Sequence, residues 1–126
     1  MLKIQLERVY GARTNARGKR ILVDRLWPRG VRKDALELDL WLRELAPSNE
    51  LRKWFGHDPR RWEEFERRYY SELRRPERQE QLHELLALAR KGPVTLLYGA
   101  RDEEHNEAVA LRKFLEGSTW KEKIQR

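Results

Sequence analysis

The sequence contains no cysteine among its 126 residues. Disulfides, thiolate catalysis and cysteine-ligated zinc are therefore excluded. No apolar run approaches the roughly 20 residues that a membrane-spanning helix needs. The first residues, MLKIQLERVYG, alternate between apolar and polar instead of forming the apolar centre of a signal peptide. From these absences we expect a soluble, cytoplasmic protein.

Familiar catalytic and phosphate-binding motifs are also missing. The chain has no G-x-x-x-x-G-K-[ST], no G-x-G-x-x-G, no G-x-S-x-G and no H-E-x-x-H. No cofactor is indicated by any of these patterns. A functional site must therefore be argued from the residue types that gather at the ends of strands and helices.

Charge is the strongest feature of the composition. Charged residues make up 39% of the chain, well above the usual quarter, and the net charge is +7. Such an excess favours anionic partners, whether phosphate, a nucleotide or nucleic acid. The cations are mixed with many acids, unlike the unbroken basic blocks of an RNA-binding tail.

Hydrophobic patterning predicts strands with turn-rich loops between them. Residues 2–9 alternate apolar and polar, and residues 20–26 contain a continuous apolar run, so both read as strands. Residues 10–19, rich in glycine and cations, predict a loop. Alternating leucines over 36–45 fit a strand but leave the assignment ambiguous. Residues 94–100 predict a buried strand.

Four helices are predicted from capping residues and apolar spacing. They cover residues 49–56, 57–75, 77–91 and 102–117. Ser48, Asp58 and Asp102 are the residues suited to cap three of them. Together these elements predict an α/β fold, a single-domain sandwich over residues 1–116 with a small, at least partly parallel sheet and about four flanking helices. A charged tail over residues 117–126 follows.

Polar side chains cluster after two of the predicted strands. The blocks are DRLWPRG, residues 24–30, and YGARDEEHN, residues 98–106. In open α/β sheets ligands bind beyond the carboxyl ends of the strands, so the two blocks converge if their strands are parallel neighbours. The candidate catalytic residues are Asp24, Asp102 and His105. The candidate ligand-binding residues are Arg25, Trp27, Arg29, Gly30, Tyr98, Arg101 and Asn106.

Each of these residues also has a structural interpretation. Asp24 can pair with an arginine to fix a turn, and Trp27 is more typical of a core than of a stacking platform. Asp102 is most simply a helix cap, which places His105 in the first helical turn, where the dipole disfavours its protonated form. Asp24, Asp102 and His105 are residue types that bind metals, but no recognised spacing supports a metal site and none is expected.

Arginine pairs recur every seven residues, at 60–61, 67–68 and 74–75, and form a stripe on the helix face opposite its apolar residues. A nucleic-acid surface can have this form. Glu64 lies inside the stripe, within i±3 and i±4 of four arginines, which favours an ion-paired, solvated face instead.

Three blocks of sequence carry a family resemblance. They are VDRLWPRG, DLWLRELAPSNELRKWFGHDPRRWEEFERRY and GPVTLLYGARDEEHNEAVALRKFL. Across residues 2–116 the chain resembles the bacterial YeaO-like proteins, domain-of-unknown-function family 488. The resemblance implies a small cytoplasmic bacterial protein and supplies neither a mechanism nor catalytic residues. The family pattern differs near Gly11, so the loop over residues 10–13 receives little weight as part of a site.

The sequence favours an enzyme or binding protein for a small phosphorylated or nucleotide-like ligand. Arg25, Arg29 and Arg101 are then expected to hold the anion. Asp24 or Asp102 is the acid or base, with His105 assisting and Asn106 orienting the ligand. One alternative is a nucleic-acid-binding accessory protein, and another is a protein-interaction domain without catalysis. The oligomeric state is not indicated.

Overall fold

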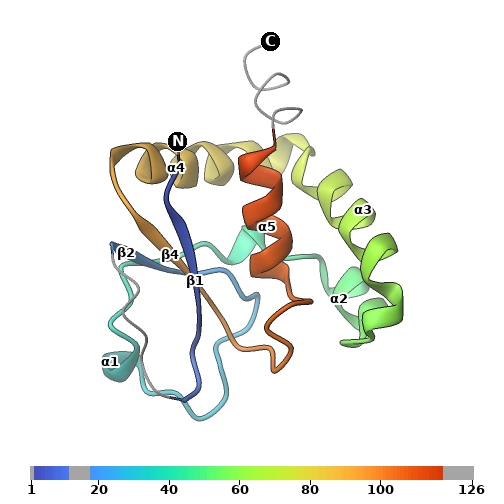
Figure 1. The fold of residues 1–126 in the computed structure, drawn as a ribbon, viewed down its shortest axis with the longest axis horizontal. Helices are drawn as coiled ribbons and strands as arrows, with labels where there is room; N and C mark the ends of the chain where they lie inside the picture. The colour runs from blue at the N-terminus through green and yellow to red at the C-terminus, as the bar shows by residue number, and fades with distance from the viewer. Residues whose placement is uncertain (1, 12–17, 118–126) are drawn as a thin grey trace.

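One parallel sheet organises the computed structural model, which describes residues 2–11 and 18–117 (Figure 1). Its strands are β1 (Ile4–Arg8), β2 (Lys19–Leu22), β3 (Leu40–Trp41) and β4 (Val94–Tyr98). They lie in the order β1-β4-β2-β3, and each neighbouring pair is parallel. The predicted α/β fold is confirmed. Because β2 and β4 are parallel neighbours, the two polar blocks that follow them leave the same edge of the sheet.

Helices surround the sheet. They are α1 (Lys33–Leu36), α2 (Asn49–Phe55), α3 (Trp62–Leu73), α4 (Pro76–Lys91) and α5 (Glu107–Glu116), with 3₁₀ turns η1 (Arg43–Leu45) and η2 (Pro59–Arg61). Helix α2 begins as predicted, because the Ser48 side chain accepts a hydrogen bond from the Leu51 N–H at 3.1 Å. Asp58 caps η2 by accepting from the Arg60 N–H at 3.0 Å, and α3 starts only after that turn.

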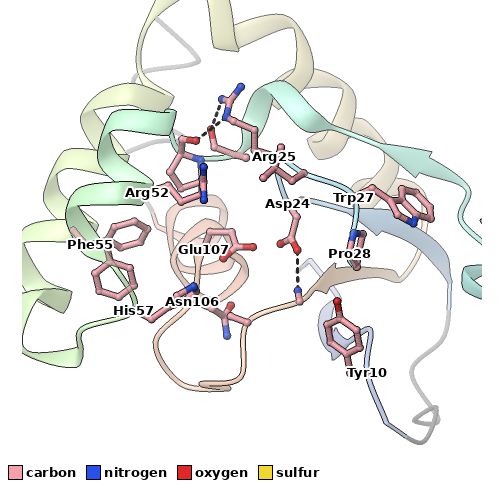
Figure 2. Close-up of a pocket in the computed structure, with 16 residues that line it drawn as sticks. Tyr10, Asp24, Arg25, Trp27, Pro28, Arg52, Phe55, His57, Asn106 and Glu107 are labelled. Carbon is pink, nitrogen blue, oxygen red and sulfur yellow. Dashed lines mark hydrogen bonds between the residues drawn. The ribbon is translucent and has the colours of Figure 1, made fainter. Parts of the chain in front are cut away.

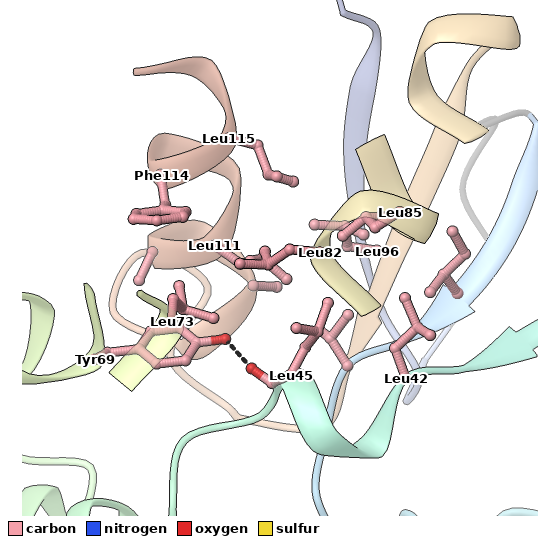
Figure 3. Packing of buried hydrophobic residues seen from close by; sticks show 14 of the residues in the cluster. Leu42, Leu45, Tyr69, Leu73, Leu82, Leu85, Leu96, Leu111, Phe114 and Leu115 are labelled. Carbon is pink, nitrogen blue, oxygen red and sulfur yellow. Dashed lines mark hydrogen bonds between the residues drawn. The ribbon is translucent and has the colours of Figure 1, made fainter. Parts of the chain in front are cut away.

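Alternate residues of the strands feed two apolar clusters, one on each face of the sheet. Ile21 and Leu96 pack into the larger cluster, which α2, α3, α4 and α5 cover (Figure 3). Within it the Tyr69 hydroxyl donates to the Leu45 carbonyl at 2.5 Å, so its one polar atom is satisfied. Leu22 and Leu97 face the smaller cluster, which the chain between Trp27 and Trp41 covers. The sheet is thus buried on both faces, as a parallel sheet requires.

The strand considered over residues 36–45 is confirmed only at its centre, where β3 spans Leu40–Trp41. Leu36 ends α1 and packs in the smaller cluster, whereas Leu42 packs in the larger one on the opposite face. Glu37 between them adopts left-handed backbone, with φ of 50°. The leucines alternate because the chain crosses from one face to the other, and only the two residues of β3 pair with the sheet.

Two further predictions concern the last helix and the segments that the structure does not describe. The last helix starts at Glu107 instead of Asp102, so its predicted beginning is wrong. Most of the loop over residues 10–19, namely 12–17, and the tail from residue 118 onward lie outside the described residues. In the part that the structure describes, none of the helices has the length and apolar character needed to cross a membrane.

Candidate functional site

A pocket of about 250 Å³ opens beyond the carboxyl ends of the strands (Figure 2). Segments that follow β1, β2 and β4 meet helices α2, α3 and α5 around it. Its lining residues are Tyr10, Asp24, Arg25, Leu26, Trp27, Pro28, Ala46, Pro47, Arg52, Phe55, His57, Phe65, Gly99, Ala100, Asn106 and Glu107. This is the place where ligands bind in open α/β sheets.

Asp24 lies at the floor of this pocket and is held by the neighbouring strand end. Its Oδ2 accepts a hydrogen bond from the Gly99 N–H at 2.9 Å. A Cβ atom at position 99 would lie 3.0 Å from that oxygen, closer than side chains normally approach, so glycine allows the contact. The other oxygen, Oδ1, is buried and has no hydrogen-bond partner among the described residues.

A neighbouring acid is Glu107, the first residue of α5, whose carboxyl group points toward Asp24 in Figure 2. The two carboxyl groups influence each other directly, since Asp24 raises the pKa of Glu107 and Glu107 lowers that of Asp24. Ionised carboxylates have acceptors only, so a hydrogen bond between the two groups requires one proton. We therefore interpret Asp24 and Glu107 as a carboxyl–carboxylate pair that holds one proton.

Burial is the main reason why the pair retains a proton. It raises the pKa of Glu107 well above its usual value, and the nearby charge of Asp24 raises this pKa further. Burial also raises the pKa of Asp24, although the hydrogen bonds to Glu107 and from the Gly99 N–H act in the opposite direction. We place the proton on Glu107, because burial raises the pKa of Glu107 well above its usual value, whereas Asp24 is raised less.

Cationic groups line another side of the pocket. Arg52, in the last turn of α2, is exposed, and only a long hydrogen bond of 3.4 Å connects it to Asn49. Arg25 is less available, because its Nε donates to the Pro47 carbonyl at 2.9 Å and its Nη2 to the Ala46 carbonyl at 3.1 Å. The guanidinium that sequence reasoning assigned to an anion thus holds the chain between η1 and α2.

His57 enters the pocket through an unusual backbone conformation. Its φ is 57°, in the left-handed region, directly after Gly56 with φ of 53°. A residue with a Cβ atom adopts this region at a cost of about 1–2 kcal/mol. Strain of this kind concentrates at functional sites. The turn brings the imidazole into the electrostatic field of Asp24, whose pKa its charge lowers slightly.

Flat apolar side chains complete the walls. Phe55 and Phe65 stack with their ring centroids 4.3 Å apart, and Pro28 is buried. Trp27 is half-buried and lies edge-on to Trp41 at 5.5 Å, while its Nε1 donates to the Val31 carbonyl at 2.7 Å. Trp27 therefore both packs in the smaller cluster and lines the pocket.

Four of the residues predicted from sequence line the pocket together: Asp24, Arg25, Trp27 and Asn106. Asn106 caps α5, accepting from the Val109 N–H at 3.0 Å, and is 1% exposed. The remaining six candidates, Arg29, Gly30, Tyr98, Arg101, Asp102 and His105, lie outside the lining. Tyr98 is instead buried in the larger cluster, and Arg29 contributes its carbonyl, which accepts from the Tyr10 hydroxyl at 2.8 Å.

Asp102 and His105 form a separate turn before α5. Asp102 accepts from the backbone N–H groups of Glu104 and His105, at 2.9 and 3.0 Å, and the Glu104 bond is the main cause that lowers its pKa. The His105 ring lies 2.9 Å from Asp102 through Nδ1 and edge-on to Trp62 at 5.3 Å. Both side chains thus have partners outside the pocket that Asp24 lines.

Glu107, Arg52 and His57 are pocket residues that sequence reasoning did not select. Glu107 was hidden because a helix starting at Asp102 places it in the interior of the helix. The signal lay in Asn106, a capping residue whose successor begins the helix. His57 directly precedes the predicted cap Asp58, and Arg52 lies within a predicted helix with no motif that marks it.

The arginine stripe of α3 is largely neutralised. Arg60 lies 3.1 Å from Asp58, and Arg68 lies 2.8 Å from Glu64, which also pairs with Arg67. Arg74 stacks over Phe114 at 5.6 Å. These contacts agree with the ion-paired, solvated face that the sequence favours.

Comparison with known proteins places the chain in a family. The family model described as the inactive DUF488-N3 subclade matches residues 3–126. The uncharacterized protein YeaO of Escherichia coli is 42% identical over 114 residues, which cover 90% of this chain and 97% of that protein. The uncharacterized protein Rv3073c of Mycobacterium tuberculosis is 37% identical over 121 residues, 91% of this chain and 95% of that protein. No solved structure matches the chain significantly. The chain therefore belongs to the YeaO-like DUF488 family, within its inactive N3 subclade.

Proposed function

We propose that this protein binds a small nucleotide-like ligand in the pocket at the strand ends. The observation that carries the proposal is the Asp24–Glu107 pair, which shares one pocket with the exposed guanidinium of Arg52. Acidic and cationic groups on different sides of one hollow suit a ligand with a nitrogen-rich head and an anionic arm. Arg52 and His57 receive the arm, and the carboxyl pair receives the head.

The size and walls of the pocket support a compact, planar ligand. Its volume of about 250 Å³ lies just below the usual range of small-molecule sites, which begins near 300 Å³. One heterocyclic ring with a short arm suits this volume. The rings of Phe55, Phe65 and Trp27 and the flat face of Pro28 offer stacking surfaces to such a ring.

Binding without turnover agrees best with the family. The matching subclade carries the description inactive. The pocket has a carboxyl pair able to act as acid and base, yet the other candidate catalytic residues, Asp102 and His105, are partners of each other outside it. We therefore propose a binding or sensing role for Asp24 and Glu107. The nucleic-acid alternative keeps its own test, the salt dependence of oligonucleotide binding.

A thermal-shift and calorimetric screen tests the proposal. Nucleobases, nucleosides, nucleoside monophosphates and inorganic phosphate form the probe set, so that head and arm are examined separately. We expect monophosphates to raise the Tm and Arg52→Ala to weaken their binding about tenfold, since a hydrogen bond to a charged group contributes about 1.5–3 kcal/mol.

Lys53→Ala is the matched control for Arg52→Ala. Lys53 is an exposed cation one position further along α2 and does not line the pocket. It removes the same charge from the same helix, so a general electrostatic effect lowers affinity equally in both variants. Equal affinities for the two variants, or no binding by any probe, would contradict the proposed function.

A further inference from the structure

We infer that the head of the ligand is a planar cation of the amidinium or guanidinium type, held between Asp24 and Glu107, and that its binding expels the proton the pair shares. This inference rests on the proposed function, because it assigns the head group of the ligand of the same pocket. It starts from two observations: both acids line the pocket, with the Glu107 carboxyl group pointing toward Asp24 in Figure 2, and Asp24 Oδ1 is buried with no hydrogen-bond partner among the described residues.

The charge of the pair is conserved in the exchange. Before binding, two carboxyl groups share one proton and carry a charge of −1. After binding, two carboxylates and one cation again carry −1, and the proton has moved to the solvent. A neutral head leaves two buried negative charges uncompensated once the proton departs, which is unfavourable in a site of low dielectric constant. The pair therefore selects a cation.

No protein side chain already fills this role. Within residues 2–11 and 18–117, neither Asp24 nor Glu107 forms an ion pair with an arginine, a lysine or a histidine. Arg25 reaches into the same pocket, but its donors go to the carbonyls of Ala46 and Pro47. The acids thus face the pocket without a direct ion pair, although His57 lies near enough to act on the charge of Asp24.

Helix α5 acts against a cation, but too weakly to prevent binding. Glu107 is its first residue, so the positive end of the helix dipole lies at the pair. That end is equivalent to about half a positive charge, whereas the two carboxylates contribute twice a full negative charge. The dipole also favours Glu107 in its ionised form, the form that the bound state requires.

The shape of the site favours a planar, forked donor. Amidinium and guanidinium groups present parallel N–H donors that match carboxylate oxygens in pairs. Their flat surfaces stack on aromatic rings, which Phe55, Phe65 and Trp27 provide. A metal ion lacks this match: the described residues include no group of three or more acids and histidines arranged to hold one.

Other ionisable groups face the pair and must be separated from it in any pH experiment. His57, Arg52, Arg25 and Tyr10 line the same pocket. Tyr69 and Tyr98 lie outside its lining; burial raises the pKa of each, and the charge of Glu107 raises it further. The imidazole of His57 is the group most easily confused with the pair. His57→Asn removes it while retaining a side chain that tolerates left-handed backbone.

Three small probes test the inference on the full chain: benzamidinium, 4-amidinobenzoate and benzoate. Isothermal titration calorimetry in buffers of different ionisation enthalpy gives the number of protons released. We expect both amidinium probes to bind with release of about one proton, benzoate to bind more weakly, and the Kd for the amidinium probes to fall as the pH rises, by roughly tenfold per pH unit where the pair holds one proton. His57→Asn should retain this dependence.

Glu107→Gln supplies the decisive variant. It keeps the size of the side chain but has no proton that ionises, so an amidinium should bind at least tenfold more weakly and release none. Glu104→Gln, in the exposed turn before α5, removes the same charge outside the pocket and should behave as the natural protein. A ¹³C NMR titration of the side-chain carboxyls provides a ligand-free check: Asp24 and Glu107 should titrate together in two separated steps.

The outcomes distinguish this inference from the proposed function. Suppose that nucleotides bind. Amidinium probes that then bind without proton release, or that bind Glu107→Gln equally well, overturn the inference alone. If the amidinium probes behave as expected but no phosphorylated probe binds, the inference is supported. The anionic arm is then removed from the proposed function. Mg²⁺ that displaces the proton while benzamidinium does not also overturns the inference. No binding by any probe overturns both.

Discussion

The indole of Trp41 donates a hydrogen bond to the backbone carbonyl of Asp24, with 2.7 Å between Nε1 and oxygen. Trp41 belongs to β3, the edge strand that has only two paired residues. The bond therefore ties the shortest strand of the sheet to the backbone of the acid at the floor of the pocket. Arg43 covers the same ring at 4.0 Å and holds it from the outer side.

Trp41→Phe is expected to lower the free energy of unfolding by about 1–2 kcal/mol. The phenyl ring preserves most of the packing, but the carbonyl of Asp24 loses its donor, and an unsatisfied buried group costs about this much. Urea unfolding measures the change. Trp54→Phe is the control, because Trp54 is half-buried and its contacts with Arg61 and Arg68 lie on the ring face. Equal losses in the two variants would show that the hydrogen bond contributes nothing.

Glu107→Gln should stabilise the protein at high pH. Burial raises the pKa of Glu107 in the folded chain above its value in the unfolded chain. Stability due to the protonated form is therefore present below the unfolded pKa of about 4.3 and is lost as the pH rises through the folded value. Glutamine stays neutral throughout, so the variant should gain about 1–2 kcal/mol at pH 8 and little at pH 4.

Denaturant titrations at a series of pH values check this prediction. Glu104→Gln, at an exposed site, is expected to show a difference from the natural protein that does not change with pH. If the stability difference for Glu107→Gln is flat between pH 4 and 8, Glu107 is ionised throughout and no proton is shared.

Local signals predicted much of the fold. Ser48 and Gly56 mark the ends of α2. The Ser48 side chain accepts a hydrogen bond from a backbone N–H of the first turn, and Gly56 adopts the left-handed conformation that ends the helix. The strand β4 could be predicted because a strand whose five residues are all buried has a nearly continuous apolar sequence. The leucines over residues 36–45 misled for a physical reason: alternation states only that successive side chains point in opposite directions. It does not separate a strand from a chain that wraps around the edge of a sheet.

The position of the candidate site could be predicted from the sequence, but not all of the residues that line it. Parallel strands bring their carboxyl ends together, which placed Asp24 in the pocket. The partner of Asp24 depended on the residue at which α5 begins, and both Asp102 and Asn106 are good capping residues. Asp102 caps a local turn and Asn106 caps the helix, so Glu107 takes the position that sequence reasoning had not considered.

Arg78→Met should destabilise the protein by about 3–5 kcal/mol. Arg78 and Glu72 are buried, 3.7 Å apart, and removal of Arg78 leaves the buried charge of Glu72 with only its hydrogen bonds from Ser48. Arg78 also donates to the Ala46 carbonyl at 2.8 Å, which forms part of the pocket wall. Urea unfolding of Arg78→Met, Glu72→Gln and the double variant should show that the second substitution recovers part of the loss. Strict additivity would contradict the proposed coupling.

Gly18→Ala and Gly30→Ala form a matched pair that separates close contact from backbone strain. Both glycines have left-handed backbone, with φ of 88° and 78°. A Cβ at Gly18 would lie 1.9 Å from the Pro93 carbonyl oxygen, where β2 begins beside β4, whereas a Cβ at Gly30 meets no atom within 4 Å. Gly30→Ala should therefore cost about 1–2 kcal/mol from strain alone, and Gly18→Ala about 3 kcal/mol or more. Both substitutions restrict the unfolded chain equally, so the difference between their free energies of unfolding measures the Pro93 contact, and equal values would show that β2 can move away from it.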